Sequence, residues 1–158
     1  MAMKPITPAR SILILVTGIF LYIVFIVPYF LPSGDAPLAS RVVSIGDVLL
    51  DVRIADTAAS RERGLSGKDT LNENEGMLFV FSKTSKDGFW MKDMRFPIDI
   101  LWFDENGELV GKKEEATPES FPEVFYPESP ARYVLETHAG FIAGYEAEYG
   151  IAPHLDLR

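Results

Sequence analysis

From residue 41 onward, the sequence consists of short apolar runs separated by turns that are rich in glycine, asparagine and aspartate. The runs favour β-branched and aromatic residues, which is typical of strands rather than helices. Two pairs of runs are joined by the hairpin-turn sequences Gly46-Asp47 and Asp104-Glu105-Asn106-Gly107. Residues 151–158 are a candidate for one further edge strand. The expected strands are Arg41–Ile45, Val48–Ala55, Met77–Phe81, Phe89–Met94, Ile98–Phe103, Glu108–Glu114 and Arg132–Thr137.

Helical segments are few and short in this pattern. Asp56 or Thr57 can cap a helix over Ala58–Leu65, and Gly140–Tyr149 is a candidate for a second helix. The proline-rich segment Thr117–Pro130 is expected to be an extended surface loop. A parallel α/β fold would need a crossover helix between most strands, and the sequence does not offer them. We therefore predict a mostly β (α+β) fold, a small, mostly antiparallel β-barrel or sandwich with one or two short helices.

The N-terminal region has a different pattern, because Ile12–Leu31 is a continuous apolar run without a charged residue. As a helix it would be about 30 Å long, which matches the hydrocarbon core of a bilayer. Lys4 and Arg10 precede the run, and the first charge after it is Asp35. Positive charge on the N-terminal side predicts a cytoplasmic N-terminus and an extracytoplasmic C-terminal domain, in the periplasm or on the cell surface.

A cleavable secretory signal is the alternative interpretation of this segment. Its apolar core is normally shorter, about 7–15 residues, and ends in a small-x-small cleavage site. Here Gly34-Asp35-Ala36 is followed by Pro37, which disfavours cleavage. We therefore predict a single-pass signal anchor in the cell membrane. The expected layout is a cytoplasmic N-terminus at residues 1–11, a transmembrane helix at 12–31, a linker at 32–40 and an extracytoplasmic β-rich domain at 41–158.

Charge and composition restrict the partners of this domain. Two of the 15 basic residues precede the apolar run, so the rest of the chain carries 13 basic and 23 acidic residues. An acidic domain is not suited to nucleic acid. The chain has no cysteine, which excludes disulfides, thiolate metal sites and thiol catalysis. We expect no cofactor, no resident metal and no nucleic acid, and a membrane contact only through residues 12–31.

Asp99 is the first candidate site residue, because it lies in an otherwise apolar strand. Strand alternation places Ile98, Ile100 and Trp102 on one face, and Asp99 on the other with Leu101 and Phe103. A carboxylate in this position is either at the rim or buried with a partner. The expected partners are Arg61, Arg63, Lys92 or Glu136. With a raised pKa, Asp99 would instead be a candidate general base.

Trp90 and Lys92 form a second candidate pair, because alternation along the predicted strand Phe89–Met94 places them on one face. In the functional interpretation they offer a flat apolar platform with a cationic edge for a sugar or an anion. In the structural interpretation Trp90 belongs to the core or to a barrel mouth, and Lys92 extends to water.

Glu136 and His138 lie two residues apart in the last predicted strand and would face the same side. Together with Asp99 they could form a carboxylate–imidazole metal site. The only other histidine is His154 in the C-terminal tail, so the grounds for a metal centre are weak. No nucleophile elbow, phosphate-binding glycine loop, dinucleotide fingerprint or paired-histidine zinc helix occurs.

Six short motifs carry a resemblance to a known family. They are Arg61-x-x-Gly64-Leu65, Gly76-Met77-Leu78-Phe79-x-Phe81, Phe89-Trp90-Met91-Lys92, Pro97-Ile98-Asp99-Ile100, Pro130-Ala131-x-Tyr133-Val134-Leu135-Glu136 and Ala139-Gly140. In this order the chain resembles domain-of-unknown-function family 192, from about Val52 to His154. The resemblance implies a compact β-rich fold with a short helix after the first strands, and no assigned catalytic residue. Ser66 and Asp93-Met94 depart from the common family pattern.

These observations predict an uncharacterised, membrane-anchored, extracytoplasmic domain that serves as a non-enzymatic binding or interaction module for a small molecule or an envelope protein. The alternatives are a cell-envelope hydrolase with Asp99 or Glu136 as the carboxylate base, and a purely structural partner of a membrane complex. The candidate binding residues are Arg61, Trp90, Lys92, Asp99 and Glu136.

Overall fold

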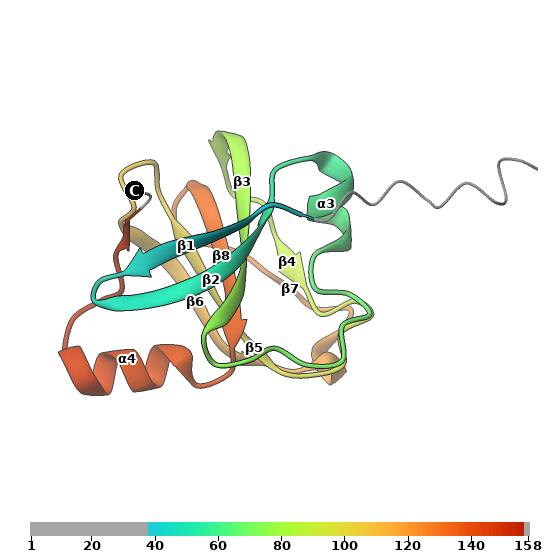
Figure 1. Cartoon of the computed structure of the whole chain (residues 1–158). Coiled ribbons are helices and arrows are strands. Elements are labelled where there is room, and N and C mark those ends of the chain that lie inside the picture. The colour runs from blue at the N-terminus through green and yellow to red at the C-terminus, as the bar shows by residue number, and fades with distance from the viewer. Residues whose placement is uncertain (1–37, 157–158) are drawn as a thin grey trace, which may run out of the picture. The chain divides into compact units, whose positions relative to one another are not determined.

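The computed structural model describes residues 38–156, which form one strongly curved sheet with two helices (Figure 1). The seven strands of this sheet follow the order β6-β5-β8-β3-β2-β1-β9, and β4 pairs with β7 in a separate small sheet. The strands are β1 (Ser40–Ile45), β2 (Val48–Ala55), β3 (Glu75–Ser85), β4 (Phe89–Trp90), β5 (Ile98–Phe103), β6 (Leu109–Ala116), β7 (Val124–Phe125), β8 (Ala131–His138) and β9 (Leu155–Asp156). The helices are α3 (Ala58–Arg63), α4 (Phe141–Tyr149) and a 3-10 turn at Pro118–Ser120.

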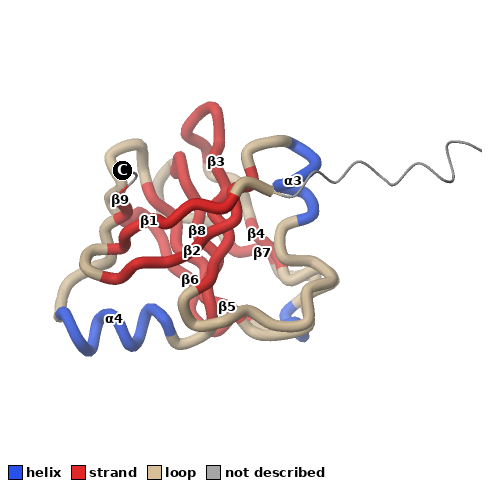
Figure 2. Tube along the Cα trace, in the orientation of Figure 1, coloured by secondary structure: helices blue, strands red, loops and turns tan. Residues whose placement is uncertain are grey.

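The predicted β-rich fold is thus confirmed as a mostly antiparallel half-barrel, but one strand pair is parallel. β2 and β3 run in the same direction, and α3 lies in the connection between them. Thr57 begins this helix with a capping box to Ser60, and Gly64 ends it at φ 52°. α3 and α4 lie at opposite ends of the sheet (Figure 2). The sequence predicted α3 from its N-cap residue and its terminal glycine, and the structure shows that α3 also forms the crossover between the parallel strands β2 and β3.

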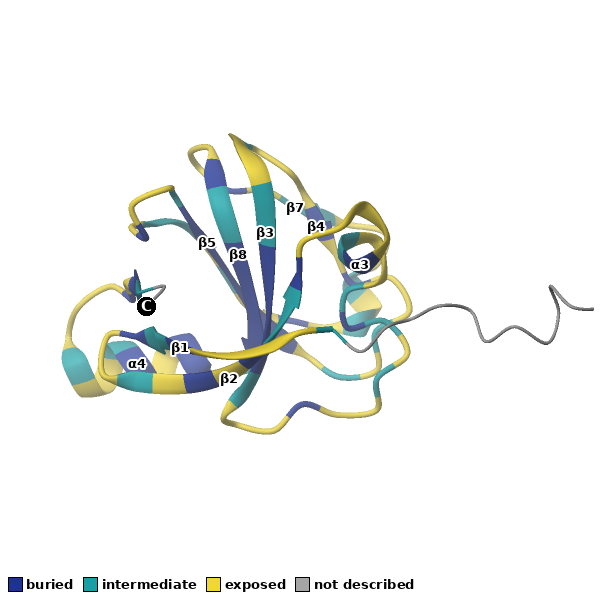
Figure 3. Ribbon diagram, turned by 45° about the horizontal axis from the view of Figure 1, so that its top comes forward, coloured by how far each residue is buried: buried dark blue, intermediate teal, exposed yellow. Residues whose placement is uncertain are grey.

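The sheet separates two hydrophobic clusters, one on each face. The cluster on the α3 side contains Ile98, Ile100 and Trp102 of β5, and the cluster on the α4 side contains Leu101 and Phe103. All six residues of β5 are buried, and the buried centre of the sheet is visible in Figure 3. The predicted alternation along β5 is confirmed, and both faces of the strand are covered.

Two strand boundaries differ from the sequence prediction. β3 continues to Ser85 beyond the apolar run, with a register irregularity against β8 after Val80. β4 ends at Trp90, and Asp93 adopts a positive φ of 57°. The prediction of a strand through Met94 is therefore wrong, because a left-handed residue interrupts the extended backbone. The expected loop at Thr117–Pro130 contains the strand that pairs with β4.

The predicted membrane anchor at residues 12–31 and the linker at 32–40, apart from its last residues, lie outside the described residues. Between residues 38 and 156, neither helix has the length and apolar character needed to cross a bilayer.

Candidate functional site

A cavity of about 250 Å³ opens between α3, the outer part of β3 and the segment around β4. We call it the α3 pocket. Phe79, Phe81 and Phe89 line its walls, and Arg61 and Trp90 lie at its rim. Glu136 reaches it from β8, an interior strand of the sheet beneath. The cavity is small for a ligand site, since such pockets are typically ~300–1,000 Å³. Like a ligand site, it combines apolar walls with a few polar groups.

Glu136 is the most unusual side chain of the α3 pocket. It is 5 % exposed, and its Oε2 has no hydrogen-bond partner among the residues described. Its neighbours in the sheet are Met77 on β3 and Ile100 on β5, which offer no polar group. Burial away from water raises the pKa of the Glu136 carboxyl to about 8. The carboxyl is therefore predominantly protonated and neutral at pH 7.

Two backbone carbonyl groups hold the guanidinium group of Arg61 in place. Its Nη1 donates to the carbonyl of Asp56 at 2.6 Å and to the carbonyl of Val80 at 3.0 Å. The guanidinium carbon lies 5.1 Å from the centre of the Phe81 ring, which is a cation–π distance. These contacts hold the charged end of Arg61 at the rim of the α3 pocket, where its other nitrogens can still donate.

Trp90 and Lys92 lie in different environments, contrary to the shared face that the sequence predicted. Trp90 is 51 % exposed at the pocket rim and meets Phe121 edge to face, with the ring centres 6.1 Å apart. Lys92 is exposed and does not line the pocket, and its backbone carbonyl accepts a hydrogen bond from Ser66. Trp90 is therefore not a core residue, and Lys92 does not accompany it at the pocket.

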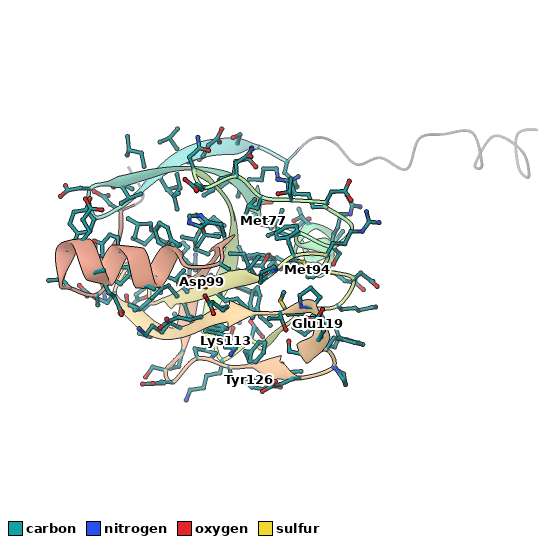
Figure 4. All side chains as sticks on the ribbon, turned by 90° about the horizontal axis from the view of Figure 1, so that it is seen from below. Met77, Met94, Asp99, Lys113, Glu119 and Tyr126 are labelled. Atoms are coloured by element: carbon teal, nitrogen blue, oxygen red, sulfur yellow. The ribbon has the colours of Figure 1, made fainter. Side chains whose placement is uncertain are left out.

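Asp99 is on the opposite face of the sheet from the α3 pocket. Figure 4 labels Asp99 on the α4 side and Met94 on the α3 side. The Asp99 carboxylate is fully buried and accepts from the amide of Glu115 at 2.8 Å and from the amide of Ile142 at 2.9 Å. The expected pairing with Arg61, Arg63, Lys92 or Glu136 is therefore wrong, because backbone amides satisfy both carboxylate oxygens.

The amide of Ile142 belongs to the first turn of α4. Gly140, the residue that precedes this helix, has no side chain to cap it. Asp99 thus supplies from β5 the cap that the helix lacks locally, and its negative charge lies at the positive end of the helix dipole. Asp99 has a structural role, and its carboxylate is not available as a general base.

The possible metal site of Asp99, Glu136 and His138 does not assemble. Asp99 and Glu136 lie on opposite faces of the sheet, and the ring of His138 packs edge to face against Phe141 of α4. Over residues 38–156, no three histidine, aspartate or glutamate side chains are grouped to hold a metal ion.

The aromatic walls of the α3 pocket were not predicted as site residues. Their signal was present in the sequence, because Phe79, Phe81 and Phe89 belong to the motifs that carry the family resemblance, as do Arg61 and Glu136. A Cβ on Gly64 would lie 3.3 Å from the Phe79 ring, so this glycine lets the end of α3 approach the wall. Motifs far apart in the chain therefore meet at one cavity.

A second cavity, of about 380 Å³, is lined by Val42, Ile54, Leu78, Val80 and Tyr133, among others. It lies over the first strands of the sheet, and none of the unpartnered buried side-chain atoms of residues 38–156 belongs to its lining. The α3 pocket is smaller but contains the chemically distinctive group, so we consider it the candidate site.

Comparison with known proteins agrees with this architecture. A "UPF0127 protein" of Thermococcus sibiricus is 34 % identical over 101 residues, which are 63 % of this chain and 62 % of that protein. The chain therefore matches less than two thirds of that relative's length. The crystal structure of a proposed transcription regulator from Sinorhizobium meliloti is similar, with a TM-score of 0.67 and 30 % identity, over 78 % of this chain and 97 % of that one.

A protein of unknown function from Novosphingobium aromaticivorans shares the fold, with a TM-score of 0.64 and 23 % identity, over 80 % of this chain and 88 % of that one. The sequence profile of the family DUF192, described as "Uncharacterized ACR", matches residues 41–152. This match spans nearly the whole sheet and both helices, and it includes every residue that we assign to the α3 pocket. The chain belongs to the DUF192 family.

Proposed function

We propose that the domain is a non-enzymatic binding module that holds a small molecule in the α3 pocket. The observation that carries this proposal is the buried Oε2 of Glu136, which lacks a hydrogen-bond partner and belongs to a cavity with phenylalanine walls. A buried polar group without a partner costs about 1–3 kcal/mol of folding free energy. A ligand that supplies the missing hydrogen bond would recover part of this free energy, and this gain would favour binding in the pocket.

The rim of the α3 pocket supports the same proposal. Trp90 exposes half of its surface, although a tryptophan side chain has much to gain from burial. Phe121 supports one side of the indole, which leaves the remainder available for contact. Exposed aromatic residues at the edge of a cavity are frequent anchors for bound partners.

Trp90→Ala is expected to remove most of the binding and to leave the fold intact. Because the side chain is half exposed, the free energy of unfolding should change by less than about 1 kcal/mol. Native and denatured mass spectrometry of the full-length protein, recovered from its own membrane, would reveal a bound molecule as excess mass. Leu49→Ala is the matched control, since Leu49 is an exposed apolar residue that does not line the pocket. An excess mass that Trp90→Ala retains would contradict the pocket as the binding site.

We further propose that residues 12–31 anchor the module in the cell membrane, with the C-terminal domain on the extracytoplasmic side. The length of the apolar run and the basic residues before it support this orientation. Either a soluble small molecule or an envelope protein could then reach the pocket without crossing the membrane.

The absence of cysteine from the chain permits a direct test of this orientation. Lys83→Cys introduces one thiol on an exposed position of β3, and Lys4→Cys introduces one before the apolar run. In intact spheroplasts, a membrane-impermeant maleimide should label Lys83→Cys, whereas Lys4→Cys should need permeabilisation. Labelling in the reverse pattern would contradict the proposed orientation.

A carboxyl-dependent hydrolase is the second candidate, and the raised pKa of Glu136 favours it. At neutral pH the protonated carboxyl would act as a general acid rather than as the base that the sequence suggested. Asp99 cannot supply the base, because both of its oxygens accept from backbone amides. Recovery of a bound molecule in chemically unchanged form would favour the binding module over the enzyme.

A further inference from the structure

The charged side chains around the α3 pocket are balanced in sign except for one. Arg61 and Arg63 contribute two positive charges to its lining, and Glu62 and Asp87 contribute two negative charges. These four lie on α3 and on the segment before β4, at the mouth of the cavity. Glu136 is the fifth ionisable group of the lining, and it approaches from the sheet beneath. Once ionised, it would be the single unbalanced charge of the pocket.

The walls around Glu136 are suited to a cation. Phe79 and Phe89 meet edge to face with their centres 4.9 Å apart, and Phe81 meets Phe89 in the same manner at 6.4 Å. Rings at near right angles present both edges and faces to their surroundings, and the faces attract positive charge. The guanidinium of Arg61 already lies over Phe81, so one cation of the chain itself is held in this way at the rim.

We infer that the ligand of the α3 pocket carries a single primary ammonium group on a small apolar body. This inference rests on the binding function proposed above. The ammonium nitrogen would donate to Oε2 of Glu136, and the apolar body would lie among the phenylalanine rings. Glu136 binds the ligand as a carboxylate, so its proton leaves to solvent as the ammonium–carboxylate pair forms.

A neutral alcohol or an anion fits the same surroundings less well. An alcohol would supply a hydrogen bond to the Glu136 carboxyl. Because it is uncharged, it would not form the cation–π contact with the aromatic faces that a cation forms. An anion would leave the aromatic faces unused, and its contact with Arg61 would lie at the rim rather than beside the buried Glu136. The monocation satisfies both the unpartnered oxygen and the aromatic rings.

Proton release provides a readout that a nonspecific contact would not produce. The other ionisable groups around Glu136 are Arg61, Glu62 and Arg63 from α3 and Asp87 before β4, with His138 two residues further along β8. At pH 7, a carboxyl with a pKa of about 8 holds about 0.9 proton, which ion-pair formation would release. Binding of the amine should therefore strengthen as the pH rises from 6 to 8.

The experiment compares three probes of similar shape, which are benzylamine, benzyl alcohol and benzoate. Each is titrated calorimetrically into the full-length protein at pH 7, in two buffers that differ in ionisation enthalpy. Benzylamine is expected to bind at least tenfold more tightly than the other two and to release close to one proton. Glu136→Gln, which keeps the shape and removes the charge, should abolish both effects, whereas Glu105→Gln, at an exposed turn position that does not line the pocket, should retain them.

The possible outcomes separate this inference from the binding function itself. If benzyl alcohol or benzoate binds as tightly as benzylamine, and Trp90→Ala weakens it, the pocket binds ligands but the amine preference is wrong. Tight benzylamine binding without proton release, or unchanged in Glu136→Gln, would also overturn the inference. Native mass spectrometry that shows no excess mass, together with no binding of any probe, would overturn the proposed function as well.

Discussion

Asp99→Ala is expected to lower the free energy of unfolding by about 4 kcal/mol, a large part of the ~5–15 kcal/mol by which domains are stable. The variant removes two hydrogen bonds to a charged acceptor. The backbone amides of Glu115 and Ile142 then lose the carboxylate that accepts from them. Because Asp99 has no exposed surface, water cannot replace the carboxylate without opening the sheet. Urea denaturation of the full-length protein, followed by far-UV circular dichroism, would measure the loss.

Asp104→Ala is the matched control for this experiment. Asp104 also accepts from two backbone amides, those of Asn106 at 2.8 Å and Glu108 at 3.0 Å, but it does so in a surface turn. Water can take over these contacts, so the expected loss is about 1 kcal/mol. Equal losses in the two variants would contradict the structural role of Asp99, because that role depends on burial rather than on the number of hydrogen bonds.

Asp99 also shows where sequence reasoning succeeded and where it could not. The alternation of apolar residues left two alternatives for Asp99, at the rim or buried with a partner, and the structure shows the buried one. Its partners could not be predicted, since the amide of Ile142 is 43 residues away and the amide of Glu115 belongs to a residue at φ 46°. Every residue except proline has a backbone amide, so the sequence does not indicate which amide will meet Asp99. Arginine is visible in the sequence as a possible partner, and the prediction therefore favoured it.

The candidate site was predicted in part for similar physical reasons. Arg61, Trp90 and Glu136 meet at one cavity, and they come from motifs that were each visible in the sequence. Lys92 does not join them, because the extended segment on which the prediction depended ends at Trp90, and Lys92 already lies in the turn that follows. Strand periodicity predicts which side chains share a face only while the backbone remains extended.

Glu136→Gln is expected to stabilise the protein by about 3 kcal/mol at pH 7, since each unit of pKa shift corresponds to about 1.4 kcal/mol. The folded-state pKa of Glu136 is about 8, against an ordinary value of 4.5. Between these two pH values the folded state keeps a proton that the unfolded chain has lost. Stability of the wild type relative to the variant therefore falls as the pH rises through this window, and it becomes constant above about pH 8.

Glutamine keeps the shape of the protonated carboxyl and does not titrate. The difference in unfolding free energy between Glu136→Gln and the wild type should thus be near zero at pH 4 and about 5 kcal/mol at pH 9, as determined by urea denaturation at each pH. Glu75→Gln provides a control of opposite sign, because hydrogen bonds from Asn72 and Lys68 lower the pKa of Glu75. Glu75 stabilises the folded state above its ordinary pKa, and this contribution is lost as the pH falls. A difference for Glu136→Gln that did not change with pH would mean that Glu136 ionises normally in the folded protein, and that the α3 pocket holds no neutral acid.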